Sequence, residues 1–170
     1  MRNLVVLKRL ILIRHAKSSW DSPALSDFDR PLNKRGEQDA PRMGRQLKEK
    51  EFAIDLFISS PAKRALTTCE KMAAILDYPS SKIKTARSLY HAEEDGILSV
   101  VKNLSDKHDI VLLFGHNPGL TDFANQLLGE HLLNVPTCGI VSCKLKINSW
   151  KEVNWGMGEL EFFDFPKKKD

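Results

Sequence analysis

The stretch Leu10-Ile11-Leu12-Ile13-Arg14-His15-Ala16-Lys17-Ser18 joins a purely apolar run to a group of basic and polar residues. Its first four residues do not alternate between apolar and polar, which predicts a strand of a parallel sheet covered on both faces. Arg14 and His15 then stand at the carboxyl end of that strand, where parallel sheets bind their ligands. The stretch therefore predicts an α/β fold and the edge of the sheet at which its site lies.

Two later segments repeat this order of buried strand and chemistry-bearing residues. The apolar residues 56–58 lead into Ser59-Ser60-Pro61-Ala62-Lys63-Arg64, and the apolar residues 110–114 lead into Gly115-His116-Asn117-Pro118. If the three strands are parallel neighbours, the polar side chains at their ends converge on one crevice. The side chains expected there are those of Arg14, His15, Arg64 and His116.

Helical periodicity and capping residues separate the predicted strands. The expected helices run from an Asn33 cap to about residue 50, from a Ser60 cap with Pro61 at its first position, over 97–104, and from Asn117-Pro118 to about 128. A weak strand is expected at 83–85, and a pair of strands at 140–147 and 160–165. This alternation predicts a three-layer α/β/α sandwich with a mostly parallel central sheet. We expect residues 1–170 to form one domain, with its core at 8–165.

The composition is that of a soluble globular chain: 170 residues, 42% hydrophobic, 28% charged, with a net charge of +4. No apolar run approaches the roughly 20 residues of a membrane span, so we expect a cytoplasmic protein without a membrane partner. The three cysteines (Cys69, Cys138 and Cys143) suit reduced thiols and match no zinc motif. No motif supports nucleic-acid binding, and we expect a monomer.

The four converging side chains suit phosphoryl transfer. Two guanidinium groups can hold a phosphoryl group by paired hydrogen bonds. A neutral imidazole is a nucleophile for phosphorus, and neighbouring cations keep it neutral. A second histidine, if protonated, can donate to the oxygens as charge moves through the transition state. With so much positive charge from the protein, neither a metal nor a cofactor is needed.

These motifs resemble the histidine phosphatase superfamily, which contains phosphoglycerate mutases and acid phosphatases. Its hallmark Arg-His-Gly is Arg14-His15-Ala16 here, with alanine in place of glycine. The Ser59–Thr68 segment, Gly115-His116-Asn117-Pro118 and the Pro31–Ala40 segment are similar to its other motifs, and the match covers about 10–128. The resemblance implies that His15 accepts the phosphoryl group. Arg14, Arg64 and His116 then complete the phosphate pocket.

Within the superfamily, the Arg-His-Ala-Lys-Ser start and the short chain resemble SixA-type phosphohistidine phosphatases. Only the 22 residues 94–115 separate Glu93 from His116, where mutases carry a long insertion that builds a cap. The resemblance therefore implies an open pocket without a cap domain. Such a pocket suits a phosphorylated side chain of another protein, and it also suits small phosphoesters.

Six further positions have weaker support as site residues. Glu93 stands in the region where mutase-like members carry the acid that protonates the leaving oxygen, although Glu93, Glu94 and Asp95 equally suit a solvated helix start. Lys17 either contacts phosphate or is solvated. Asp21 stands where many members place an asparagine, and a carboxylate there repels phosphate unless an arginine pairs with it. The remaining histidines have no supporting motif and are expected to be structural or exposed: His91, His108 and His131.

Three functions remain open from the sequence. The leading one is a metal-independent phosphatase for phosphohistidine in a signalling or phosphotransfer protein. P–N cleavage releases an imidazole, which needs less protonation than an alkoxide, so a missing acid favours this substrate. The second is a small-molecule phosphomonoesterase that uses Glu93 or Glu94 as its acid. The third is a non-catalytic phosphoprotein-binding module, which Ala16 and the uncertain acid suggest.

Overall fold

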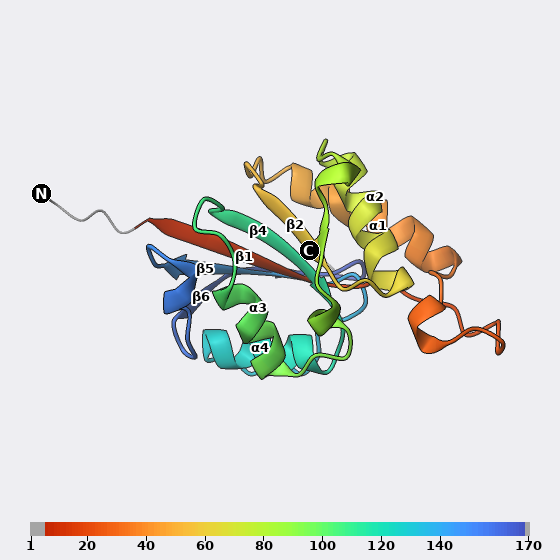
Figure 1. Cartoon of the computed structure of the whole chain (residues 1–170). Coiled ribbons are helices and arrows are strands. Elements are labelled where there is room, and N and C mark those ends of the chain that lie inside the picture. Colours follow the sequence, from red (N-terminus) through yellow and green to blue (C-terminus); the bar gives the residue numbers. More distant parts are fainter. Residues whose placement is uncertain (1–5, 169–170) are drawn as a thin grey trace, which may run out of the picture.

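The computed structural model describes residues 6–168 as a six-stranded sheet between two layers of helices (Figure 1). The strand order is β3-β2-β4-β1-β5-β6. The strands are β1 (Leu7–Arg14), β2 (Leu56–Ser59), β3 (Lys84–Thr85), β4 (Ile110–Gly115), β5 (Ile140–Lys146) and β6 (Gly158–Asp164). The helices are α1 (Lys34–Lys48), α2 (Lys63–Ile75), α3 (Glu94–Lys102) and α4 (Gly119–Leu128). The predicted three-layer α/β/α sandwich is confirmed, and within residues 6–168 no cap domain stands over the sheet edge.

The sheet is mixed but mostly parallel. β1, β2, β3 and β4 run parallel to one another, while β5 pairs antiparallel with β1 and β6 pairs antiparallel with β5. β2, β4 and β1 are consecutive in the sheet, so their carboxyl ends lie side by side. The expected pairing of the last two strands is confirmed, and a 3₁₀ helix at Trp150–Glu152 lies in their connection.

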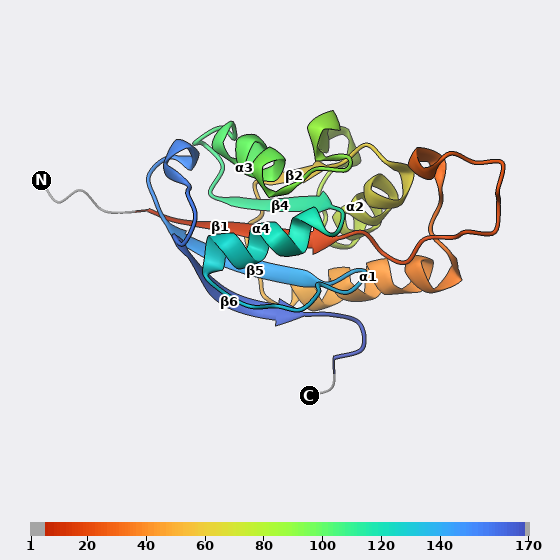
Figure 2. The ribbon, with the colours of Figure 1, turned by 90° about the horizontal axis from the view of Figure 1, so that it is seen from below.

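Burial on both faces explains the unbroken apolar run of β1. Leu10 and Leu12 pack into the core under α3 and α4, whereas Ile11 and Ile13 pack into the core under α1 and α2. All four are fully buried. The two helix pairs lie on opposite faces of the sheet in Figures 1 and 2. Removing this much apolar surface from water is the main stabilisation of the sandwich.

The observed helix starts agree only in part with those predicted from the sequence. Asn33 caps α1 as predicted, because its side chain accepts a hydrogen bond from the backbone N–H of Gly36 at 2.9 Å. The expected start of α2 at Ser60 is wrong, since the helix begins at Lys63 after Ala62. The Ser60 N–H donates to the carbonyl of Phe114, and the Ser60 hydroxyl accepts from the N–H of Ala62 at 3.3 Å and bonds to His116 at 2.8 Å.

Two other helix boundaries also differ from the prediction. α4 begins at Gly119, and Asn117 holds its first turn by accepting from the N–H of Thr121 at 3.1 Å. α3 begins at Glu94 rather than 97, since its acidic first turn favours the positive end of the helix dipole. Glu94, the first residue of α3, lines the same crevice as His116, so α3 begins near the carboxyl edge of the sheet.

The loop that follows β1 folds back over α2. Its base is tied by the N–H of Asn33, which donates to the carbonyl of Lys17, and by a bridge between Ser18 and Leu32. Gly36 packs its α-carbon against the Lys17 carbonyl, where a larger side chain would clash. The far part of the loop forms a 3₁₀ helix at Asp27–Asp29, which these ties hold beside the start of α2.

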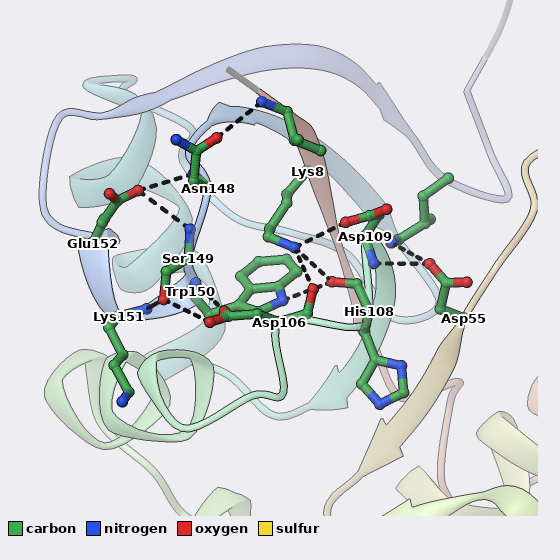
Figure 3. Close-up of polar contacts among 12 residues, drawn as sticks. Lys8, Asp55, Asp106, His108, Asp109, Asn148, Ser149, Trp150, Lys151 and Glu152 are labelled. Carbon is green, nitrogen blue, oxygen red and sulfur yellow. Dashed lines mark hydrogen bonds and ion pairs between the residues drawn. The ribbon is translucent and has the colours of Figure 1, made fainter. Parts of the chain in front are cut away.

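A buried lysine closes the opposite end of the sheet (Figure 3). The ammonium of Lys8, which is 1% exposed, donates to the carbonyls of Asp106 and His108 at 3.0 Å each and to Oδ1 of Asp109 at 2.8 Å. It also lies 5.4 Å from the ring of Trp150, whose indole N–H donates to the carbonyl of His108. All three ammonium protons are used, so Lys8 joins β1 to the loop before β4 and is structural.

The three cysteines are buried free thiols, as the sequence predicts. Burial raises the pKa of Cys69, Cys138 and Cys143 above the ordinary range, which leaves them unreactive. The backbone N–H of Cys138 donates to the carbonyls of Arg14 and His15, so this residue positions the end of β1. Among residues 6–168, no helix has both the length and the apolar composition needed to cross a lipid bilayer.

Candidate active site

A pocket of about 380 Å³ opens at the adjoining carboxyl ends of β2, β4 and β1. The four side chains that the sequence analysis expects to converge all line it. They come from the ends of β1 and β4 and from the first turn of α2, which follows β2, and the sheet order β2-β4-β1 brings them together. The full lining is Arg14, His15, Lys17, Ser18, Trp20, Asp27, Arg30, Arg64, His91, His116, Asn117 and Thr137.

His15 is held in one tautomer by the backbone carbonyl of the next residue, Ala16. Its Nδ1 lies 2.7 Å from the carbonyl oxygen of Ala16, which can only accept a hydrogen bond, so Nδ1 carries the proton and Nε2 keeps its lone pair. Burial, and then the charges of Arg64 and Arg14, lower the pKa of His15 to about 4. The imidazole is therefore neutral near pH 7, with a free lone pair on Nε2.

The alanine that departs from the Arg-His-Gly motif fits this arrangement. The methyl group of Ala16 is fully buried in the core under α1 and α2. Its backbone N–H donates to the hydroxyl of Thr68 at 3.0 Å, and its carbonyl accepts from His15. The substitution therefore leaves the orientation of His15 intact.

His116 faces His15, with 5.2 Å between the ring centroids. Burial, followed by the charges of His15 and Arg64, lowers the pKa of His116 to about 3. The ring is thus neutral near pH 7, which differs from the protonated donor considered from the sequence. A hydrogen bond of 2.8 Å joins its Nε2 to the hydroxyl of Ser60. When that hydroxyl donates to Nε2, the neutral ring presents Nδ1–H as its remaining donor.

In Arg14 and Arg64, some guanidinium nitrogens are hydrogen-bonded to the protein, while Nε of each has no partner. Arg14 donates from Nη1 to the carbonyl of Val135 at 2.9 Å. Arg64, 4% exposed, donates from Nη1 to the carbonyl of Asp27 at 2.6 Å and from Nη2 to its carboxylate at 3.0 Å. In the part of the chain from 6 to 168, three buried side-chain atoms lack a hydrogen-bond partner: Nε of Arg14, Nε of Arg64 and Nδ1 of His116. These nitrogens can serve an anion with several oxygens.

Asp27 is a pocket residue that the sequence analysis missed. Its carboxylate pairs with Arg64, accepts from the hydroxyl of Tyr90 at 2.6 Å and lies 3.1 Å from Nη2 of Arg30. Burial acts to raise the pKa of Asp27, but the hydrogen bonds from Tyr90 and Arg64 outweigh it and hold the pKa well below its usual range. The only local signal is the i, i+3 spacing of Asp27 and Arg30. Asp21, which the sequence analysis singled out, is exposed and does not line the pocket.

The remaining predicted positions lie at different places around the pocket. Lys17 lines it and is exposed. Glu93 lies outside it, in a neighbouring crevice of about 390 Å³ that also contains Glu94 and Asp122. His91, expected to be structural or exposed, is 65% exposed but lines both the pocket and this crevice. Across the described span 6–168, no group of three His, Cys, Asp or Glu side chains is arranged to hold a metal ion.

Fold and pocket together define an α/β protein with a cationic, histidine-bearing pocket at the carboxyl edge of its sheet. Residues 10–89 match the model of the histidine phosphatase superfamily (branch 1). An uncharacterised chloroplastic protein of Arabidopsis thaliana is 35% identical over 155 residues, which cover 86% of this chain and 71% of that protein. The chain belongs to the histidine phosphatase superfamily.

Solved structures of SixA-type proteins share this fold. The protein from Nakamurella multipartitia, provisionally named phosphohistidine phosphatase SixA, superposes with a TM-score of 0.81 at 22% identity, over 95% of this chain and 98% of that one. The Agrobacterium tumefaciens protein with the same provisional name gives 0.77 at 25% identity, over 94% and 98% of the two chains. The likeness to SixA-type proteins expected from the Arg-His-Ala-Lys-Ser start is confirmed.

Proposed function

We propose that this protein is a metal-independent phosphatase that forms a covalent phosphohistidine at His15 and acts on phosphohistidine in a signalling or phosphotransfer protein. The observation that carries the proposal is the state of His15. It is a buried, neutral imidazole whose Nδ1–H donates to the carbonyl of Ala16 and whose Nε2 is free. An unprotonated ring nitrogen beside two arginines is what in-line attack on phosphorus requires.

Each pocket residue has a role in the proposed reaction. Arg14 and Arg64 hold the phosphoryl oxygens, and His116 donates from Nδ1 as negative charge develops on them. Nε2 of His15 attacks phosphorus while the bond from phosphorus to the substrate nitrogen breaks. Water then attacks the phosphoryl group on His15, the P–N bond to His15 breaks, and phosphate leaves. Asp27 keeps the Arg64 guanidinium in one orientation through two hydrogen bonds.

Shape and relationship support a protein-borne substrate. Within residues 6–168 the pocket is not covered by a further domain, so a side chain that projects from another protein can reach it. The names of the two SixA-type structures refer to phosphohistidine as the substrate of those proteins. The expected cytoplasmic location and monomeric state stay predictions.

A small phosphoester is the second candidate substrate. The observation in its favour is the crevice beside His116, which gives room for a leaving group next to the phosphate. The third possibility, a non-catalytic binding module, rested partly on Ala16. It loses that support because Ala16 still accepts the hydrogen bond that orients His15.

The test is a labelling experiment. The purified protein is mixed with a ³²P-phosphohistidine protein in the presence of a chelator and quenched in alkali, and label is sought on His15. We expect transient label and phosphate release from the wild type and from His131→Ala, which replaces an exposed histidine that does not line the pocket, but neither from His15→Ala. A folded wild-type protein that binds phosphate without label or release from several donors would support the binding module instead.

A further inference from the structure

His91 stands at the junction of the phosphate pocket and the crevice beside it. It is among the few residues that line both, together with His116 and Asn117. Its ring lies over His116 with 6.5 Å between centroids, and 4.0 Å from the ring of Tyr90. A leaving group that extends from the phosphate into the crevice would pass this imidazole.

The backbone holds His91 in this place at some conformational cost. Its φ is 57°, in the left-handed region that non-glycine residues seldom adopt. The next residue, Ala92, packs its carbonyl against the α-carbon of Gly119, where any larger side chain would clash. The segment that carries His91 is therefore docked directly on the first turn of α4, beside His116. Strained residues of this kind gather at functional sites.

Asp27 faces the ring of His91 from the other side. Its Oδ2 lies 3.5 Å from Nε2 of His91, and the same oxygen accepts from Tyr90 and Arg64. This contact places a carboxylate against the ring of His91 at the rim of a pocket that is otherwise cationic.

Four other groups at or near the pocket are less suited to protonating a leaving group. His15 is the nucleophile, and its Nδ1 proton is held by Ala16. Asp27 is ionised through its contacts with Tyr90 and Arg64, so it has no proton to give. His116 is neutral at the pH of catalysis. Glu93 lies in the crevice but outside the phosphate pocket.

We propose that His91 is the acid–base catalyst of this site, which protonates the leaving group and so allows the pocket to cleave phosphomonoesters of alcohols as well as phosphohistidine. The inference rests on the proposed function, since it takes His15 as the phosphoryl acceptor. It assigns to His91 the role for which the sequence suggested Glu93. A histidine suits both directions of proton transfer near neutral pH.

The proposed reaction has two steps, the transfer of the phosphoryl group to His15 and the hydrolysis of phosphorylated His15. Nε2 of His15 bonds to phosphorus as the ester P–O bond breaks, and the imidazolium of His91 gives a ring proton to the departing oxygen. Neutral His91 then takes a proton from the water that attacks phosphorus. The P–N bond to His15 breaks, and phosphate leaves with His91 protonated again.

The experiment compares two phosphate esters of nearly equal size. The anion of p-nitrophenol leaves without protonation, whereas the alkoxide of benzyl alcohol does not, so only benzyl phosphate needs the acid. We expect His91→Asn to lower kcat/KM for benzyl phosphate about 100-fold and to change that for p-nitrophenyl phosphate less than about threefold. Asparagine also tolerates the left-handed backbone, which protects the fold. His131→Asn is the matched control and should leave both rates unchanged, whereas Glu93→Gln tests the acid suggested by the sequence and should not lower the benzyl phosphate rate selectively.

Each other outcome overturns the inference. An equal loss for both esters means that His91 shapes the pocket without transferring a proton. No loss for either ester, or a loss selective for benzyl phosphate in Glu93→Gln, assigns the proton elsewhere. A wild-type protein that labels His15 and cleaves p-nitrophenyl phosphate but not benzyl phosphate refutes the inference and leaves the proposed function standing. Absence of label and of all turnover refutes both.

Discussion

Mild acid should destabilise this protein through its two buried histidines. The pKa of His15 is lowered from about 6.5 to about 4 and that of His116 to about 3, chiefly by burial. Both folded-state values lie below the unfolded one, so the unfolded chain binds more protons once the pH falls below about 6.5. The stabilisation is therefore present above that pH and is lost as the pH falls toward the folded-state values.

The size of the effect follows from these two shifts. Between about pH 7 and pH 5, each histidine should lower the free energy of unfolding by about 2 kcal/mol, and the pair by about 4 kcal/mol. Replacing either by asparagine removes one titrating group, so His15→Asn and His116→Asn should each lose about 2 kcal/mol less stability over this range than the wild type. The comparison uses the change with pH, so an altered stability at pH 7 does not disturb it.

The assay is urea unfolding followed by tryptophan fluorescence, since Trp150 is fully buried in the native protein. It is run at several pH values in buffers without phosphate, because a bound anion would stabilise the folded state. His131→Asn is the control and should follow the wild type. If His15→Asn and His116→Asn lose as much stability on acidification as the wild type, the two imidazoles do not resist protonation and the case for a neutral nucleophile fails.

Three further predictions concern charged groups. Arg64→Lys keeps the charge but loses the forked donors, so kcat/KM should fall about 30-fold by steady-state kinetics while Lys63→Arg, on the neighbouring exposed residue, should leave it unchanged. Asp27→Asn should lower the free energy of unfolding by about 1–2 kcal/mol at neutral pH and by about 1 kcal/mol less near pH 3, because below about pH 3.8 the unfolded chain binds a proton that the folded carboxylate resists. Equal destabilisation at both pH values would contradict this. Lys8→Met should cost about 3 kcal/mol in urea unfolding without altering kcat, and a loss of kcat in a folded variant would show that Lys8 affects the distant site.

Sequence reasoning worked best where a feature depends on neighbours along the chain. The run Leu10–Ile13 predicts a strand buried on both faces because a continuous apolar strand has no face for water, and β1 is such a strand. Asn33 predicts the start of α1 because a cap needs only the N–H groups of the next turn. Ser60 carries the same local signal, but its hydroxyl also bonds to His116 from another part of the chain, and the helix begins only at Lys63.

The sequence by itself determined the buried strands, the layered fold and the motif residues Arg14, His15, Arg64 and His116 at three strand ends. The tertiary structure decided that β2, β4 and β1 are neighbours, and it added Asp27 and His91 to the pocket. Asp27 reaches Arg64 only because the loop after β1 folds back over α2, and His91 reaches His116 only because Ala92 docks on Gly119. Such contacts join residues far apart in the chain, so no local periodicity records them. The protonation states of His15 and His116 likewise depend on burial and on charges brought from other elements, and these exist only in the folded chain.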